Sequence, residues 1–155
     1  MGINDFEFLH ELTTKGSLVL TQAKSFSEAI YESNIPYRPG IYLVYSLSKE
    51  GSDDYLLYYG KAGVTGHSGM ASLNFHQLPR RLVATIKIPE NHPDFGRKTF
   101  STRAEIWPWY VKNVYKYGIR IYWFIAEWPS QNPNDYEKRI KAHLKEKYPQ
   151  WEKSI

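Results

Sequence analysis

Residues 40–45 read Gly-Ile-Tyr-Leu-Val-Tyr, and residues 55–61 read Tyr-Leu-Leu-Tyr-Tyr-Gly-Lys. Both stretches are rich in β-branched and aromatic residues and have the length of a strand, so each is predicted to form one. The residues between them, 46–54, are mostly polar and contain Gly51, which suits a chain reversal. The sequence therefore predicts a β-hairpin with its turn near Glu50.

Two tyrosines of this hairpin form a candidate site. If Tyr42 pairs directly with Tyr58, the turn falls around Glu50 and the two phenols project from the same face of the sheet. Tyrosine is a common strand residue, and the chain has 13 of them, so neither tyrosine alone indicates a site. The glycines beside them, Gly40 and Gly60, make the pair more specific.

The strings GIY at 40–42 and YYG at 58–60 resemble the two motifs that give the GIY-YIG nuclease family its name. Members of the family have an arginine on the helix after the second strand, and Arg81 matches it, with Arg80 as the alternative. They also have a metal-binding glutamate early on a later helix, which Glu137 matches. The resemblance covers residues 39–151 and implies a nuclease fold and activity.

The chain departs from the family pattern at three places. Thr85 stands where many members have a histidine, four residues after the arginine. Residues 64–77 look like an insertion before the arginine, and only Gln150 lies near the place where many members have an asparagine after the glutamate helix. His76, or alternatively His67, is a candidate from the insertion to replace the absent histidine. The two tyrosines, the arginine and the glutamate are all kept.

The resemblance assigns a role to each matched residue. Glu137 would bind one Mg²⁺ or Mn²⁺, and Arg81 would hold the non-bridging phosphate oxygens through its planar fork. Tyr42 would be the general base, with Tyr58 positioning the water or the phosphate, although the sequence leaves these two roles interchangeable. Lys61 would favour loss of the phenolic proton or hold a phosphate.

The charge of the chain points weakly to an anionic partner, for which the resemblance implies DNA. The net charge is +4 and the isoelectric point is about 9.1, values shared by many proteins that bind no nucleic acid. The basic residues that follow the hairpin are candidates for contacting a phosphate backbone. They are Arg80, Lys87, Arg97, Lys98 and Arg103, together with His76.

The predicted fold is of the α+β type, with a small three-stranded mixed or antiparallel sheet flanked by helices, as in GIY-YIG proteins. Residues 36–155 would form the nuclease-like domain, preceded by an N-terminal extension over residues 1–35. The third strand is predicted at 119–127, where residues of both alternating sets are apolar. Such a strand lies inside a sheet that is covered on both faces.

Several helices are predicted between and around these strands. The extension holds one that begins with a capping box at Ser25, and another lies near residues 80–85. Pro108 is expected to interrupt a helix begun at Thr102, so the next helix is placed from Trp107 to Gly118. The last helix is expected from an N-cap at Asn134 to residue 148, with Glu137 in its first turn.

Composition excludes several classes of protein and site. The chain has no cysteine and its five histidines show no paired ligand spacing, so disulfides and zinc are not expected. It has no signal-peptide pattern and no apolar run of about 18 residues. A single domain that is soluble and intracellular, hence cytoplasmic, is predicted from its 155 residues.

The sequence thus predicts a divalent-metal-dependent DNA endonuclease that hydrolyses phosphodiester bonds with a tyrosine-activated water. In that case Tyr42, Tyr58, Arg81 and Glu137 should converge on one concave surface. Without a separate reader domain, specificity would come from insertions or from a homodimer. The alternatives are a catalytically impaired GIY-YIG-like module that binds nucleic acid or another partner, and a purely structural aromatic-rich domain.

Overall fold

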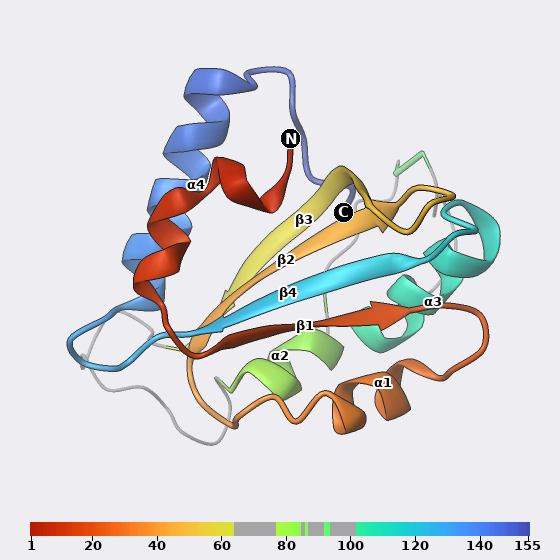
Figure 1. The fold of residues 1–155 in the computed structure, drawn as a ribbon, viewed down its shortest axis with the longest axis horizontal. Helices are drawn as coiled ribbons and strands as arrows, with labels where there is room; N and C mark the ends of the chain where they lie inside the picture. The colour runs from red at the N-terminus through yellow and green to blue at the C-terminus, as the bar shows by residue number, and fades with distance from the viewer. Residues whose placement is uncertain (64–76, 85, 87–91, 94–101) are drawn as a thin grey trace.

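The computed structural model describes residues 1–63, 77–84, 86, 92–93 and 102–155. These residues form an α+β fold around one antiparallel sheet, in the strand order β1-β4-β2-β3 (Figure 1). The strands are β1 (Lys15–Leu20), β2 (Gly40–Leu47), β3 (Asp53–Ala62) and β4 (Ile119–Ile125).

The predicted hairpin is confirmed. Strands β2 and β3 pair antiparallel, and the turn between them is closed by a hydrogen bond from the Ser48 amide to the Ser52 carbonyl. Gly51 has φ +83°, in the left-handed region that favours glycine. The polar stretch therefore reverses the chain where the sequence placed the turn.

The predicted pairing of the two tyrosines is wrong by two residues. Tyr42 lies opposite Gly60, and Tyr58 lies opposite Val44. A shift of two residues keeps each side chain on its face of the sheet. Tyr42 and Tyr58 accordingly still project from the same face, where both join one hydrophobic cluster.

Two irregularities in β3 cause this shift. Near the turn, Leu47 pairs with Asp53, as a turn centred on Glu50 requires. The register then skips Asp54 and later Leu57, so β3 has one extra residue at each of two places. Extra residues of this kind are β-bulges, and no local pattern in the sequence indicates them.

The sheet has four strands rather than the expected three. The fourth is β1, from the N-terminal 35 residues, which pairs antiparallel with β4 along its whole length. Strand β4 is thereby enclosed between β1 and β2, and most of its side chains are buried. This confirms the prediction that the strand beginning at Ile119 lies inside the sheet.

Helices cover both faces of the sheet (Figure 1). One face carries α1 (Phe26–Glu32), α2 (Leu78–Val83) and α3 (Arg103–Asn113), which pack on the cluster that contains Tyr42 and Tyr58. The other carries α4 (Pro133–Lys147) and the 3-10 turns η1 (Ile3–Asp5) and η2 (Glu7–Glu11). The two faces are called the α1–α3 face and the α4 face below.

Helix α1 begins as predicted, with the Ser25 hydroxyl accepting a hydrogen bond from the Glu28 amide. Helix α3 begins at Arg103 instead of Trp107, and Pro108 lies inside it. A proline there removes one intrahelical hydrogen bond. Burial of Trp107 and its neighbours on the same helix face offsets that loss, because packing stabilises helices more than local propensity does.

Helix α4 begins two residues earlier than expected. Its N-cap is Asn132, whose side chain accepts a hydrogen bond from the Asn134 amide, and Pro133 takes the first helical position. The acidic residue of the first turn is therefore Asp135 rather than Glu137. Glu137 lies about one turn into the helix. No helix among the described residues is long and apolar enough to cross a membrane.

Candidate functional site

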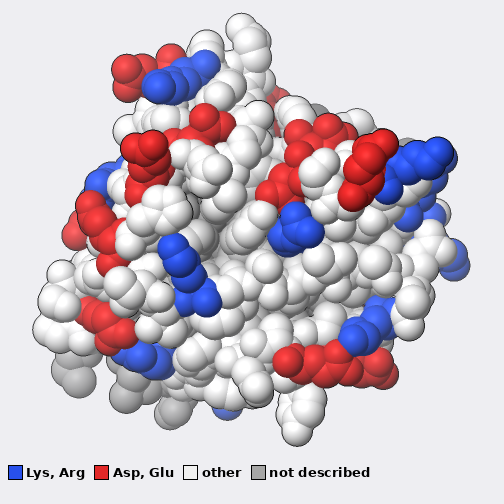
Figure 2. All heavy atoms as spheres, viewed as in Figure 1, with Lys and Arg blue, Asp and Glu red and all other residues white. Residues whose placement is uncertain are grey.

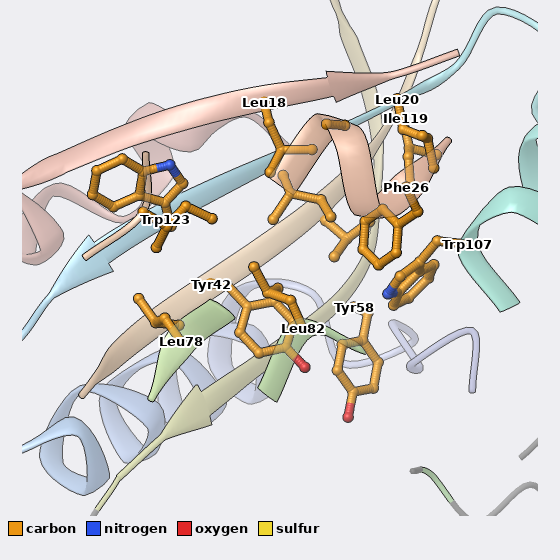
Figure 3. Packing of buried hydrophobic residues seen from close by; sticks show 14 of the residues in the cluster. Leu18, Leu20, Phe26, Tyr42, Tyr58, Leu78, Leu82, Trp107, Ile119 and Trp123 are labelled. Atoms are coloured by element: carbon orange, nitrogen blue, oxygen red, sulfur yellow. The ribbon is translucent and has the colours of Figure 1, made fainter. Parts of the chain in front are cut away.

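Tyr42 and Tyr58 lie side by side on the α1–α3 face. Their ring centroids are 6.0 Å apart and their planes are inclined by 31°. In Figure 3 both hydroxyls point away from the labelled Leu18 and Leu20. A Cβ at residue 60 would lie 2.6 Å from the Tyr42 hydroxyl oxygen, so the glycine of the second motif leaves the space that the ring of Tyr42 occupies.

The Tyr42 hydroxyl is enclosed. The residue has no exposed surface, and its hydroxyl has no hydrogen-bond partner of normal geometry among the described residues. Burial raises the pKa of the Tyr42 phenol well above its ordinary value, with a further contribution from Tyr58, while Arg103 and Arg81 lower it by less. A phenol in these surroundings keeps its proton at neutral pH, which disfavours Tyr42 as a general base.

The Tyr58 hydroxyl, in contrast, has a cationic partner. It accepts a hydrogen bond from Nη2 of Arg103 at 3.2 Å, and its ring packs against Trp107 at 5.8 Å. Arg103 is only 2% exposed and also donates from Nη1 to the Ala84 carbonyl oxygen at 3.3 Å. The predicted contact of Arg103 with DNA is disfavoured, because folding buries its guanidinium against the Tyr58 hydroxyl.

The two arginines of α2 have different surroundings. Arg80 is exposed, whereas Arg81 is partly buried and close enough to Tyr42 to lower the pKa of its phenol. The structure thus brings Arg81, and not Arg80, to the tyrosine pair. We call Tyr42, Tyr58, Arg81 and Arg103 the phenol cluster.

Glu137 and Lys61 form a second group. The Lys61 ammonium is 3.5 Å from Oε1 of Glu137 and donates a hydrogen bond to the side-chain oxygen of Asn134. Lys61 lies opposite Ile41, which belongs to the α4-face cluster. We call Lys61, Asn134 and Glu137 the carboxylate cluster. Asn134 was expected to cap α4, and its contact with Lys61 was not predicted.

The four core residues do not converge on one surface, contrary to the prediction. Helix α4 packs its apolar residues Tyr136, Ile140 and Leu144 on the α4 face. Glu137 therefore lies across β3 from Tyr42 and Tyr58. The sequence could not assign α4 to a face, because an amphipathic stripe indicates that a helix packs and not which side of a sheet it covers.

The two clusters are nevertheless neighbours along β3, one of the two edge strands of the sheet. The ammonium of Lys153 lies close to side chains of both faces at this edge. It lies 4.7 Å from the ring centroid of Tyr58 and 4.2 Å from that of Tyr59, although these rings belong to clusters on opposite faces. One charged group at the edge of β3 thus contacts side chains from both faces.

The carboxylate cluster has donors suited to a hard cation. The Glu137 carboxylate and the Asn134 amide oxygen both contact the ammonium of Lys61. The same two oxygens would attract a metal cation. Mg²⁺ prefers oxygen ligands and is often held by one or two carboxylates together with waters and phosphate. Among the described residues no three His, Cys, Asp or Glu lie together, so a metal here would rest on Glu137 with Asn134.

Some candidate residues lie outside the described part of the chain. They are His67, His76, Thr85, Lys87, Arg97 and Lys98. Among the described residues on the face shown in Figure 2, Lys and Arg are interspersed with Asp and Glu, and they form no broad basic surface there.

No protein-family model matches the chain, and neither a curated protein nor a solved structure matches it significantly.

Proposed function

We propose that this protein is a divalent-metal-dependent DNA endonuclease in which Tyr58 activates the attacking water. The observation that supports this proposal is the pairing of the Tyr58 hydroxyl with the buried guanidinium of Arg103. A cation beside a phenol stabilises the negative charge that appears when the phenol loses its proton. The Tyr42 hydroxyl is fully buried, and burial raises the pKa of its phenol, so the proposed roles of the two tyrosines are reversed from those implied by the family.

In the proposed reaction Tyr58 first loses its phenolic proton to solvent, and its phenolate oxygen then takes a proton from a water molecule. The water oxygen forms a bond to phosphorus, the bond from phosphorus to the leaving oxygen breaks, and that oxygen takes up a proton from solvent. Arg81 contacts the non-bridging oxygens as negative charge grows on them, and its planar fork suits two of them at once. The ring of Tyr42 packs beside that of Tyr58 and helps to hold it in place.

The carboxylate cluster lies across β3 from Tyr58, so in this proposal the phosphate meets both clusters around the edge of that strand, where Lys153 contacts rings from both faces. Glu137, with Asn134, would hold Mg²⁺ or Mn²⁺, which neutralises phosphate charge when bound. Lys61 exchanges its contact with Glu137 for one with a phosphate oxygen. Both side chains are about one third exposed, 33% for Lys61 and 30% for Glu137, so this exchange requires no unfolding.

A module that binds DNA or another partner without cleaving it is the second candidate. The position of Glu137 favours it, because that carboxylate is paired with Lys61 and lies across the strand from Tyr58. In such a module Glu137 would be a structural partner of Lys61. Substitution of Glu137 would then change binding alone.

A plasmid-nicking assay with Mg²⁺ and with Mn²⁺ separates the two candidates. We expect the parent protein to nick supercoiled DNA and Glu137→Gln to lose the activity while binding DNA equally or slightly more tightly, since one negative charge is removed. Glu146→Gln is the matched control, because Glu146 is exposed on the same helix, and it should nick at the parental rate.

Two results would contradict the proposal in different ways. If Glu137→Gln nicks as fast as the parent in both metals, Glu137 is not the metal ligand. If the parent binds DNA with no metal-dependent nicking, the non-cleaving module is the better description.

A further inference from the structure

The most deeply buried charge among the described residues belongs to Arg103, at the start of α3. Arginine is seldom buried this far, because removing its charge from water costs free energy that hydrogen bonds must offset. Burial lowers the pKa of the Arg103 guanidinium, but the phenols of Tyr42 and Tyr58 raise it by more. The hydrogen bond that the guanidinium donates to the Tyr58 hydroxyl is part of what compensates for this burial.

The contacts of Arg103 join three parts of the chain. Its side chain donates to the Tyr58 hydroxyl at 3.2 Å and to the Ala84 carbonyl at 3.3 Å, and its own amide donates to the same carbonyl at 2.9 Å. Ala84 directly follows α2, the helix that carries Arg81. One guanidinium therefore fixes the Tyr58 hydroxyl relative to the end of the helix that carries Arg81.

A guanidinium only donates hydrogen bonds. The hydrogen of the Tyr58 hydroxyl must consequently point away from Arg103. Nearby positive charge also stabilises any negative charge on that oxygen, more strongly in a buried site than in water. The second effect is the one that a tyrosine base requires, because it favours loss of the phenolic proton.

We propose that Arg103 is a positioning residue that acts through Tyr58, orienting its hydroxyl and stabilising negative charge on its oxygen without touching DNA. The inference rests on the proposed nuclease function. It also assigns Arg103 a role that differs from the phosphate contacts of Arg81.

The kinetic test is a double-mutant cycle between Arg103 and Tyr58. Arg103→Lys keeps the charge but loses the planar guanidinium that donates to both the Tyr58 hydroxyl and the Ala84 carbonyl. The value of kcat should therefore fall by about tenfold or more, with KM nearly unchanged. In a Tyr58→Phe background the same substitution should have no further effect. A loss that persists in full in that background, or no loss in the Tyr58 protein, overturns the proposal.

Chemical rescue tests the same contact with a larger change. Arg103→Ala removes the guanidinium, and added methylguanidinium should restore part of the nicking rate if the variant is folded. Tyr58→Phe is the control, which methylguanidinium should not rescue. Failure of rescue in a folded Arg103→Ala protein that binds methylguanidinium counts against the role. If that variant does not fold, Arg103→Lys carries the test.

A spectroscopic readout does not depend on cleavage. With ¹³Cζ-labelled tyrosine, the Tyr58 resonance is the one absent from Tyr58→Phe. Arg103→Lys should move this resonance and leave that of Tyr31, which is 84% exposed, unchanged. An unmoved Tyr58 resonance overturns the inference whatever the cleavage assay shows. If the resonance moves but the parent protein never cleaves DNA, the proposed function fails, and the role of Arg103 in it fails with it.

Discussion

The two sides of β3 hold polar and charged side chains in very different surroundings. In the phenol cluster, Tyr42, Tyr58 and Arg103 are between 0% and 7% exposed. In the carboxylate cluster, Lys61 and Glu137 are each about one third exposed, at 33% and 30%. Charges interact more strongly when water is excluded, while exposed pairs are screened.

This difference suggests different tasks for the two clusters. The phenol cluster is held by packing, so its groups keep their positions whether or not a ligand is present. The carboxylate cluster can exchange one cation for another at small cost, because water already solvates both partners. The first arrangement suits orientation of a reacting group, and the second suits reversible binding of a metal or a phosphate.

The largest expected effect separates the two tyrosines of the phenol cluster. Tyr58→Phe should lower the rate of plasmid nicking by about 10²–10⁴-fold, the usual contribution of a general base. Tyr42→Phe keeps the buried ring and removes a hydroxyl without a partner among the described residues, so it should lower the rate far less. A larger loss of nicking rate in Tyr42→Phe than in Tyr58→Phe would show that Tyr42, and not Tyr58, is the general base.

A smaller effect, on stability, is expected from filling the space at Gly60. A Cβ there would lie 2.6 Å from the Tyr42 hydroxyl, and the buried ring has little room to move. Gly60→Ala should therefore lower the free energy of unfolding by about 1–3 kcal/mol, as overpacking does, measured by urea denaturation.

Gly2→Ala is its control, since nothing lies within 4 Å of a Cβ at that position. Equal stability of Gly60→Ala and the parent would mean that the Tyr42 ring is not confined, and the contrast between the two sides of β3 would weaken.

The smallest effect on stability is expected in the carboxylate cluster, whose charged residues are partly exposed. Lys61→Met should change the free energy of unfolding by no more than about 1 kcal/mol, because exposed ion pairs contribute little. The same substitution removes the cation that contacts Glu137, so Mn²⁺ should bind more tightly, by up to about tenfold. Calorimetric titration with Mn²⁺ measures this, with Lys138→Met as the control at an exposed site on α4, the helix that carries Glu137.

A loss of stability of several kcal/mol in Lys61→Met would show that the carboxylate cluster is structural. Unchanged or weaker Mn²⁺ binding would remove the support that this cluster gives to a metal site.

The sequence alone determined the elements whose signals are local. Apolar and aromatic runs located β2, β3 and β4, the polar stretch around Glu50 located the turn, and the capping residue at Ser25 located α1. Alternation on both faces also identified β4 as an interior strand. Each of these signals depends on neighbours within a few residues, because strand pleat, turn geometry and helix capping have short periods.

Only the tertiary structure decided how those elements meet. Two β-bulges set the pairing of Tyr42 with Gly60, β1 added a fourth strand, and packing placed α4 on the face opposite Tyr58. Arg103 became a partner of Tyr58 across 45 residues of chain. Such outcomes depend on contacts between distant segments, whose free energies are settled by burial in the whole fold and leave no periodic trace in the sequence.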